Sequence, residues 1–106
     1  MRRRNNKVYI AGKITGDGEY RKKFAEAERY LTEWLEWKPE EVVNPVKECR
    51  EGWPWWRCMV RCLRLVAGCK FVAMLPDWND SRGARIEHGW AQILGKVILY
   101  LNTLTF

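Results

Sequence analysis

The chain has 106 residues, of which 47% are hydrophobic and 30% are charged, and the net charge is +6. This balance allows one compact core and excludes wholesale disorder and a coiled coil. The longest apolar runs, at residues 71–75 and 97–101, have about five residues, whereas a transmembrane helix needs about 20. We therefore expect no membrane span, and no secretory signal, because the basic start leads directly into a strand-like run.

The positive charge suits a partner that carries phosphate. Part of the excess comes from Arg2, Arg3 and Arg4, which we expect to form a solvated basic tail (residues 1–6) of a single domain over residues 1–106. No recognised nucleic-acid motif accompanies the charge, so nucleic acid is not the expected partner. The remaining balance favours a small phosphorylated ligand.

Four cysteines stand at positions 49, 58, 62 and 69. Their gaps match no C-x-x-C metal or redox pattern, although Cys58 and Cys62 are one helical turn apart and can face each other. His88 is the one further soft ligand, so we expect no metal site. The sequence favours four reduced thiols that pack as small hydrophobic groups in a cytoplasmic protein.

The first elements in chain order are a strand over residues 7–11 and a helix from Tyr20 that ends before Pro39. Asp17 is the candidate cap of this helix. Apolar residues occupy one face of the helix and charged residues occupy the other. The apolar face comprises Phe24, Ala27, Leu31, Trp34 and Leu35, and the charged face comprises Lys22, Lys23, Glu26, Arg29 and Glu33.

A short strand over residues 41–43 stops at Asn44-Pro45 and is followed by a loop. Pro54 suits the first turn of a second helix, which runs to about Ala67 with Gly68 as its C-cap. The apolar stripe of this helix comprises Met59, Cys62, Leu63 and Val66, and a basic stripe comprises Arg57, Arg61 and Arg64.

The last third of the chain contains an apolar strand over residues 71–75, a polar loop, a helix over residues 83–94 and a final apolar strand over residues 97–101. Strands that alternate with helices predict an α/β fold, here a three-layer Rossmann-like (flavodoxin-like) sandwich with a small parallel sheet of about four strands. Ligands of such sheets bind outside the carboxyl ends of the strands. That rule selects residues 12–19, 44–53, 76–83 and 102–106 as candidate site segments.

Glu87 is the sharpest single signal for a site. It shares a helical stripe with Ala84, Ala91 and Leu94, and this stripe is expected to face the sheet. A carboxylate there loses hydration and needs compensation, part of which a helix N-terminus supplies. Glu87 is therefore either a nucleophile or general base, or a structural carboxylate tied to an amide or an arginine.

Ser81 and Gly83 also have two interpretations. A serine and a glycine at a helix N-terminus can hold a phosphate on backbone N–H groups, or the serine can be an ordinary N-cap. His88 points about 100° away from Glu87, so we expect an interface or surface residue there and no catalytic base.

The last helix carries a second apolar stripe formed by Ile86, Trp90 and Ile93. A helix that is apolar on two sides must be buried on two sides. We expect a second subunit to cover this stripe, which predicts a homodimer or a higher homo-oligomer. The alternative is that the Trp-rich loop of the same chain covers it.

Motifs from four places in the chain together resemble one known family. They are Val8-Tyr9-Ile10-Ala11-Gly12, Thr15-Gly16, Val43-Asn44-Pro45 and Leu75-Pro76-x-Trp78-x-x-Ser81-x-Gly83-Ala84-x-x-Glu87. Over residues 7–100 the chain resembles the DUF4406 domain, which is similar to nucleoside 2-deoxyribosyltransferases and 2′-deoxynucleoside 5′-monophosphate N-glycosidases. The resemblance implies a Rossmann-like sheet, an oligomer with sites near subunit contacts, and chemistry at a glycosidic bond without a cofactor.

The resemblance also implies roles for particular residues. Glu87 would be the nucleophile that attacks the anomeric carbon, and Tyr9 would hold its carboxylate. The reaction would be retaining, with a covalent glycosyl-enzyme intermediate. Asp80 and Ser81 would lie in the loop that contacts the base, sugar or 5′-phosphate. The other implied substrate-binding residues are Gly12, Thr15, Gly16, Asn44, Pro45, Asp77 and Gly83.

Two positions depart from the family pattern. Cys62 stands where an acidic residue commonly assists proton transfer to the leaving base, and Lys70 stands where another Asp commonly precedes the third strand. Asp77 or Asp80 is the candidate to take over the acid role. The resemblance implies an N-glycosidic bond hydrolase or a deoxyribosyltransferase for a nucleoside or nucleotide. The alternative is a non-catalytic nucleotide-binding module of the same fold.

The tryptophan-rich loop has two interpretations as well. Trp53, Trp55 and Trp56 either form an aromatic lid that stacks on the base or plug the edge of the sheet.

Overall fold

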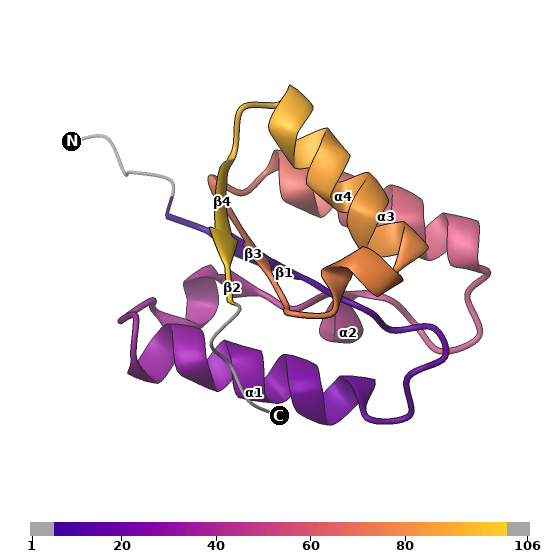
Figure 1. The fold of residues 1–106 in the computed structure, drawn as a ribbon, viewed down its shortest axis with the longest axis horizontal. Helices are drawn as coiled ribbons and strands as arrows, with labels where there is room; N and C mark the ends of the chain where they lie inside the picture. Colours follow the sequence, from indigo (N-terminus) through magenta and orange to yellow (C-terminus); the bar gives the residue numbers. More distant parts are fainter. Residues whose placement is uncertain (1–5, 102–106) are drawn as a thin grey trace.

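Figure 1 shows the fold in a computed structural model, which describes residues 6–101. The strands are β1 (Val8–Ala11), β2 (Val42–Val43), β3 (Phe71–Met74) and β4 (Val97–Tyr100). The helices are α1 (Tyr20–Glu33), α2 (Pro45–Glu48), α3 (Trp55–Ala67) and α4 (Arg82–Ile93), with short 3₁₀ turns η1 (Pro39–Glu41) and η2 (Trp78–Asp80). Residues 1–5 of the basic tail and the candidate segment 102–106 lie outside the described residues.

All four strands pair in parallel and form one sheet in the order β2-β1-β3-β4. Each parallel pairing requires a crossover, and the intervening helices supply it. This arrangement confirms the predicted α/β class and the small Rossmann-like sandwich. Between residues 6 and 101, no helix is both long enough and apolar enough to cross a bilayer.

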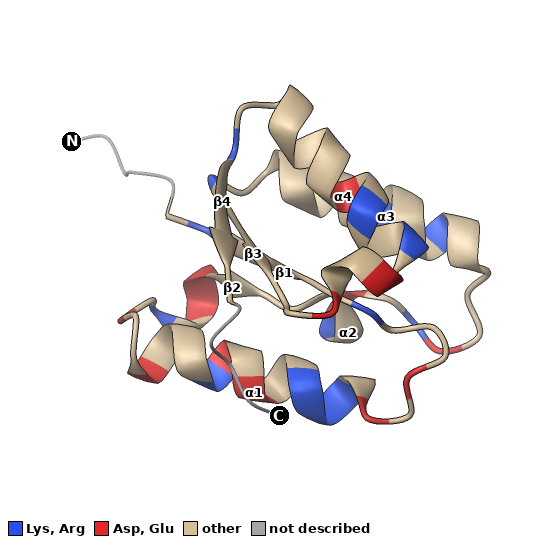
Figure 2. Cartoon of the chain, viewed as in Figure 1, with Lys and Arg blue, Asp and Glu red and all other residues tan. Residues whose placement is uncertain are grey.

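The central strand β1 is buried on both faces because helices cover both sides of the sheet (Figure 1). Successive side chains of a strand point to opposite faces. Val8 and Ile10 accordingly pack on the side of α1, whereas Tyr9 and Ala11 pack on the side of α3 and α4. Figure 2 shows that none of the four strands carries a charged side chain, so charge is confined to helices and loops.

The helix α1 differs from its predicted pattern at both ends. Phe24, Ala27 and Leu31 are buried as predicted, but Trp34 is 74% exposed and Leu35 is also exposed. The helix stops at Glu33, and the backbone turns within three residues, so the later side chains leave the buried face.

The predicted cap Asp17 is also wrong, because Glu19 occupies the N-cap position and no side chain caps α1. Asp17 instead accepts a hydrogen bond from the backbone N–H of Glu19 and forms an ion pair with Lys23. Lys23 was expected on the solvent-facing side of the helix, but it is only 7% exposed. Partners from distant loops explain its burial, as described below.

The helix α4 presents the two stripes that its sequence predicts. Ala84, Glu87 and Ala91 are buried, whereas Leu94 is partly exposed because it follows the last helical residue. On the second stripe, Ile93 is 78% exposed and Ile86 is 39% exposed. The Trp-rich loop within the described part of the chain therefore does not cover these two isoleucines. The expected second subunit stays a prediction.

The cysteines correct the expectation of four reduced thiols. Cys49 and Cys58 form a disulfide, while Cys62 and Cys69 are free and buried. The sequence predicts a loop after β2, but the short helix α2 forms there and Asn44 caps it. This helix returns the chain toward the start of α3 and so brings Cys49 to Cys58. The spacing of the two cysteines in the sequence does not reveal that contact.

Candidate functional site

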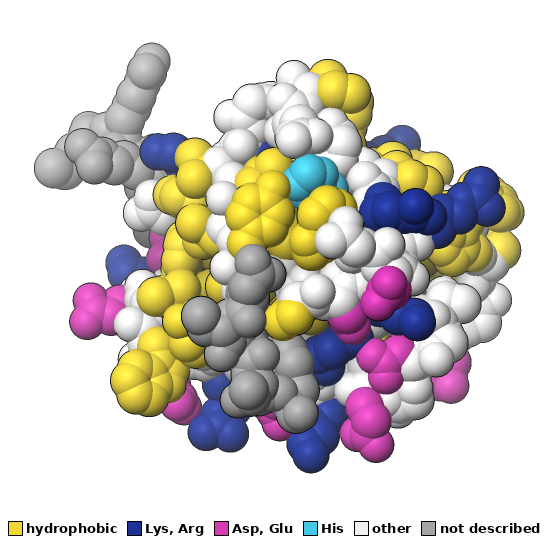
Figure 3. All heavy atoms as spheres, in the orientation of Figure 1, with side chains coloured by type: hydrophobic (Ala, Val, Ile, Leu, Met, Phe, Trp, Pro, Cys, Tyr) yellow, Lys and Arg dark blue, Asp and Glu magenta, His cyan; other side chains and the backbone are white. Residues whose placement is uncertain are grey.

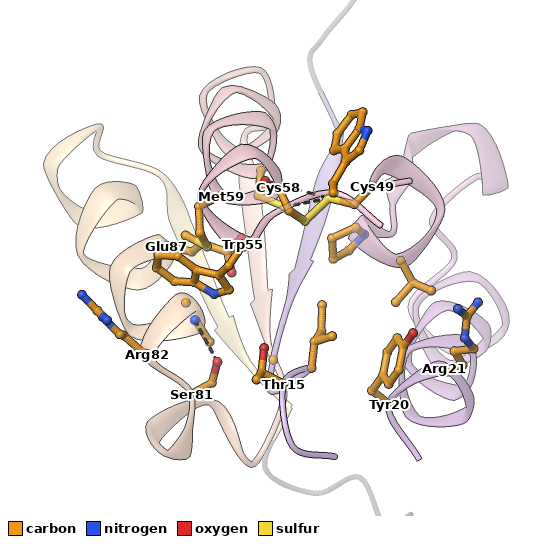
Figure 4. Close-up of a pocket in the computed structure, with 18 of the residues that line it drawn as sticks. Thr15, Tyr20, Arg21, Cys49, Trp55, Cys58, Met59, Ser81, Arg82 and Glu87 are labelled. Carbon is orange, nitrogen blue, oxygen red and sulfur yellow. Dashed lines mark hydrogen bonds between the residues drawn. A yellow bond between two sulfur atoms is a disulfide. The ribbon is translucent and has the colours of Figure 1, made fainter. Parts of the chain in front are cut away.

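A cavity of about 770 Å³ opens among the loops that follow β1, β2 and β3 (Figure 4). Its place at the carboxyl ends of parallel strands is where α/β sheets bind ligands. Its volume is in the range of cavities that take a small molecule. Three of the four candidate segments contribute to its wall, and the fourth lies beyond residue 101.

Most of the predicted site residues meet at this cavity. The lining includes Tyr9, Gly12, Thr15, Pro45, Asp80, Ser81, Gly83 and Glu87. Gly16, Asn44 and Asp77 are not part of the lining. Asn44 is buried and accepts a hydrogen bond from the backbone N–H of Val46 at 3.0 Å, so its side chain positions α2.

Glu87 and Tyr9 form a buried pair at the wall of the cavity. Glu87 lies in the second turn of α4 and is 5% exposed, and Tyr9 lies in β1 and is fully buried. The Tyr9 hydroxyl donates a hydrogen bond to Oε2 of Glu87. A strand at the centre of the sheet and a helix packed above it therefore hold this carboxylate from two directions.

Burial controls the charge of this pair. Desolvation raises the pKa of Glu87 to about 7, and hydrogen bonds from Tyr9 and Cys62 partly oppose that rise. Burial, followed by the nearby Glu87 charge, raises the pKa of Tyr9 well above its ordinary value. The same two causes raise the pKa of the Cys62 thiol to about 12. Tyr9 and Cys62 thus stay protonated at neutral pH and act as donors, whereas Glu87 changes charge there.

Ser81 caps α4, because its hydroxyl oxygen accepts a hydrogen bond from the backbone N–H of Ala84 at 3.1 Å. The N-cap interpretation is therefore confirmed. Gly83 lies close to Met59, and a Cβ there would sit 3.1 Å from the thioether sulfur. A phosphate role for this helix terminus stays a prediction.

Sequence reasoning missed a buried cation that joins two of the site loops. Lys23 donates to the carbonyl of Lys13 at 2.9 Å and to the carboxylates of Asp17 and Asp77. Asp77 also accepts a hydrogen bond from the backbone N–H of Lys13. The lysine hydrogen bond lowers the pKa of Asp17. Asp77 therefore links the loop after β3 to the loop after β1, and its carboxylate is already engaged.

Three lining residues were not predicted individually: Arg82 lies inside the candidate segment 76–83, and Tyr20 and Arg21 lie outside all four candidate segments. Figure 4 shows Trp55 and Arg82 on one side of the cavity and Tyr20 and Arg21 on the other. The Arg82 guanidinium lies 5.3 Å from the centre of the Trp55 ring, a cation–π distance. A signal was present, since Arg82 stands between Ser81 and Gly83 and Tyr20 opens a helix after a glycine-rich loop.

The tryptophans and His88 divide between the cavity and the surface. Trp53 and Trp55 line the cavity, whereas Trp56 is 64% exposed and does not. His88 stacks on Trp78 with 4.2 Å between ring centres, and its Nε2 lies 2.7 Å from the Tyr100 hydroxyl. Figure 3 shows the imidazole within an apolar area of the surface, and it is not part of the cavity lining.

The two departures from the family pattern lie in different surroundings. Cys62 lines the cavity, where burial and the nearby Glu87 charge raise the pKa of its thiol. Lys70 follows the end of α3, and its ammonium lies over the ring of Phe71. It does not contribute to the cavity wall.

A protein-family profile described as domain of unknown function (DUF4406) matches residues 6–100. No curated protein matches the sequence. Because the profile spans nearly the whole chain, this protein belongs to the DUF4406 family.

Proposed function

We propose that the protein cleaves or transfers the N-glycosidic bond of a nucleoside or nucleotide, with Glu87 as the nucleophile. The observation that carries this proposal is the buried Glu87–Tyr9 pair at the wall of the cavity. A carboxylate with a pKa near 7 is ionised in about half of the molecules at neutral pH, and low hydration makes its charged form reactive.

The proposed reaction has two steps. The Glu87 carboxylate attacks the anomeric carbon, the carbon–nitrogen bond breaks, and the base leaves with the bonding electron pair and gains a proton. Water or a second base then attacks the same carbon and releases Glu87, so the configuration is retained. Tyr9 fixes one carboxylate oxygen throughout and keeps the nucleophile oriented.

The proton for the leaving base needs a donor other than Cys62. A thiol with a pKa of about 12 is a weak acid at neutral pH. Asp80 lines the cavity at the end of η2 and is the carboxyl group that we assign to this role. Asp77 is the weaker candidate, because its carboxylate is held by Lys23.

Cationic groups around the cavity favour a 5′-phosphorylated substrate. Arg21, Arg50 and Arg82 all contribute to its wall. Guanidinium groups bind phosphate through paired N–H donors. Trp55 offers an aromatic face for the base in the same wall. No step of this reaction calls for a cofactor.

The test is release of free base. The protein would be incubated with each deoxynucleoside and each deoxynucleoside 5′-monophosphate, and free base would be measured by chromatography. We expect release that is faster with the monophosphates and is abolished in Glu87→Ala. A second base added in excess separates transfer from hydrolysis, because transfer yields a new nucleoside.

Cys62 also supports a second candidate function, a nucleotide-binding module without turnover. Here the thiol occupies a place beside Glu87 where a carboxylic acid would serve proton transfer. This candidate predicts saturable nucleotide binding by calorimetry together with no base release at the same concentrations. That pair of results would exclude the enzyme. We place either function in the cytoplasm, in a homodimer or a higher homo-oligomer.

A further inference from the structure

Three cysteine sulfurs gather at one place in the cavity wall. Cys49 follows α2, whereas Cys58 and Cys62 lie one turn apart on α3 and therefore share a face of that helix. The Cys62 sulfur lies 3.9 Å from the sulfurs of both Cys49 and Cys58. All three side chains line the cavity, and Figure 4 labels the Cys49–Cys58 disulfide there.

The disulfide holds two of these sulfurs in their oxidised form. A dithiol reductant opens it by supplying two electrons and two protons, and the reductant itself becomes a disulfide. The product carries three thiols whose sulfur atoms all lie within 4.8 Å of one another before any rearrangement.

This spacing matches the ligand shell of a thiolate-bound metal ion. Zinc–sulfur bonds are about 2.3 Å long, and tetrahedral geometry then places two sulfur ligands about 3.8 Å apart. Cys62 already stands at this distance from both other sulfurs. Only the Cys49 and Cys58 sulfurs need to separate, and reduction removes the bond that joins them.

We propose that the reduced chain binds one soft divalent metal ion, Zn²⁺, through the Sγ atoms of Cys49, Cys58 and Cys62, and that the Cys49–Cys58 disulfide abolishes this site. Each thiol releases one proton on binding, so three protons leave for each zinc bound. Burial and the nearby Glu87 charge oppose ionisation of the Cys62 thiol, so the charge of the bound cation has to overcome them.

The site has the access and the coordination that such an ion needs. Because the three sulfurs line the cavity, an ion reaches them from solvent without unfolding. Three protein ligands leave the fourth tetrahedral position open. The Glu87 carboxylate lies in the same cavity wall.

The test is metal binding to the whole chain in its two redox states. The protein would be reduced with a dithiol, freed of reductant without air, and titrated with Co²⁺ and then Zn²⁺. We expect a thiolate-to-cobalt absorption band that Zn²⁺ displaces, and one zinc for each chain by elemental analysis. Protein that retains the disulfide should show neither. An absence of binding by the reduced, folded chain would overturn the proposal.

Two matched variants test Cys62 as a ligand. Cys62→Ala should weaken zinc binding by about 100-fold or more, whereas Cys69→Ala, which removes the other buried free thiol, should leave binding unchanged. Circular dichroism checks that both variants are folded. Equal losses in the two variants would contradict the assignment. Because no substrate is used, this result does not depend on whether the protein releases free base.

Discussion

The phenol of Tyr9 donates a hydrogen bond to the carboxylate of Glu87, which lies 78 residues later in the chain, and water reaches neither group appreciably. The contact exists because β1 occupies the middle of the sheet and α4 packs on the face to which Tyr9 points. One bond thus fixes the position of the proposed nucleophile and also opposes the effect of burial on its pKa.

Glu87→Gln should remove a loss of stability that the wild-type protein undergoes as the pH rises. Burial raises the pKa of Glu87 in the folded state to about 7, above its ordinary value of 4.5. The folded state therefore binds this proton more tightly than the unfolded state, and the stability it contributes is lost as the pH rises from about 4.5 to about 7. The loss is on the order of 3 kcal/mol. Glutamine carries no proton to lose.

The measurement is the free energy of urea unfolding of both proteins between pH 4 and pH 8. The difference between the variant and the wild type should grow across this range. Glu40→Gln, at an exposed position in η1, is the control and should show a constant difference. A constant difference for Glu87→Gln would mean that Glu87 does not titrate in this range.

Tyr9→Phe should shift the pH dependence of base release. Loss of the hydroxyl removes a donor that favours the ionised form, so the pKa of Glu87 should rise further. A hydrogen bond to a charged group is worth about 1.5–3 kcal/mol, which corresponds to about one to two pH units. The acidic limb of the kcat/KM profile should move upward by that amount. Tyr30→Phe is the control, and an unmoved limb in Tyr9→Phe would exclude Tyr9 as a positioning residue.

Gly12→Ala should destabilise the fold by about 1–3 kcal/mol through overpacking. A Cβ at this position would lie 2.5 Å from Cδ1 and 2.9 Å from Cβ of Leu75, which is fully buried. The close approach joins the ends of β1 and β3 directly beneath the cavity. Gly18→Ala is the matched control, because a Cβ there meets no atom within 4 Å. Thermal unfolding of the two variants gives the comparison, and equal midpoints would contradict the packing argument.

Ile93→Glu should convert the predicted homo-oligomer into a monomer. Ile93 and Ile86 are exposed on α4, and Val97 and Tyr100 are exposed on the neighbouring edge strand β4. A second copy would bury this apolar surface, and a charge within it would oppose that burial. Light scattering after size exclusion measures the mass. Trp34→Glu, at the exposed end of α1, should leave the mass unchanged, and a wild-type monomer at high concentration would refute the prediction.

The sequence predicts the framework because its signals there are local. The apolar runs that become β1 and β3, the glycine after α3 and the buried stripe of α4 all follow from periodicity and caps. The same reasoning identifies Glu87, since a carboxylate is unusual on the helical stripe that faces a sheet, whatever the rest of the fold.

The features that the sequence does not reveal depend on contacts between distant residues and on where the elements end. Lys23 is buried because Asp77 reaches it from a loop 54 residues away, and no window of sequence contains both. The Cys49–Cys58 disulfide depends on how α2 turns the chain, and the exposure of Trp34 depends on where α1 stops. In each case a distant contact partner or the end of a helix, rather than the type of residue, decides whether the side chain is buried, bonded or exposed.

Different forces hold two sides of the cavity. On the side of α3, the disulfide closes a covalent ring over residues 49–58 that carries Trp53 and Trp55. On the side of α1, the ion cluster of Lys23 holds the loop after β1, and the Lys23 hydrogen bond lowers the pKa of Asp17, which keeps that carboxylate charged in mild acid. A reductant should therefore loosen the aromatic wall and leave the opposite wall in place. Strong acid should loosen the wall that the Lys23 cluster holds and leave the disulfide intact.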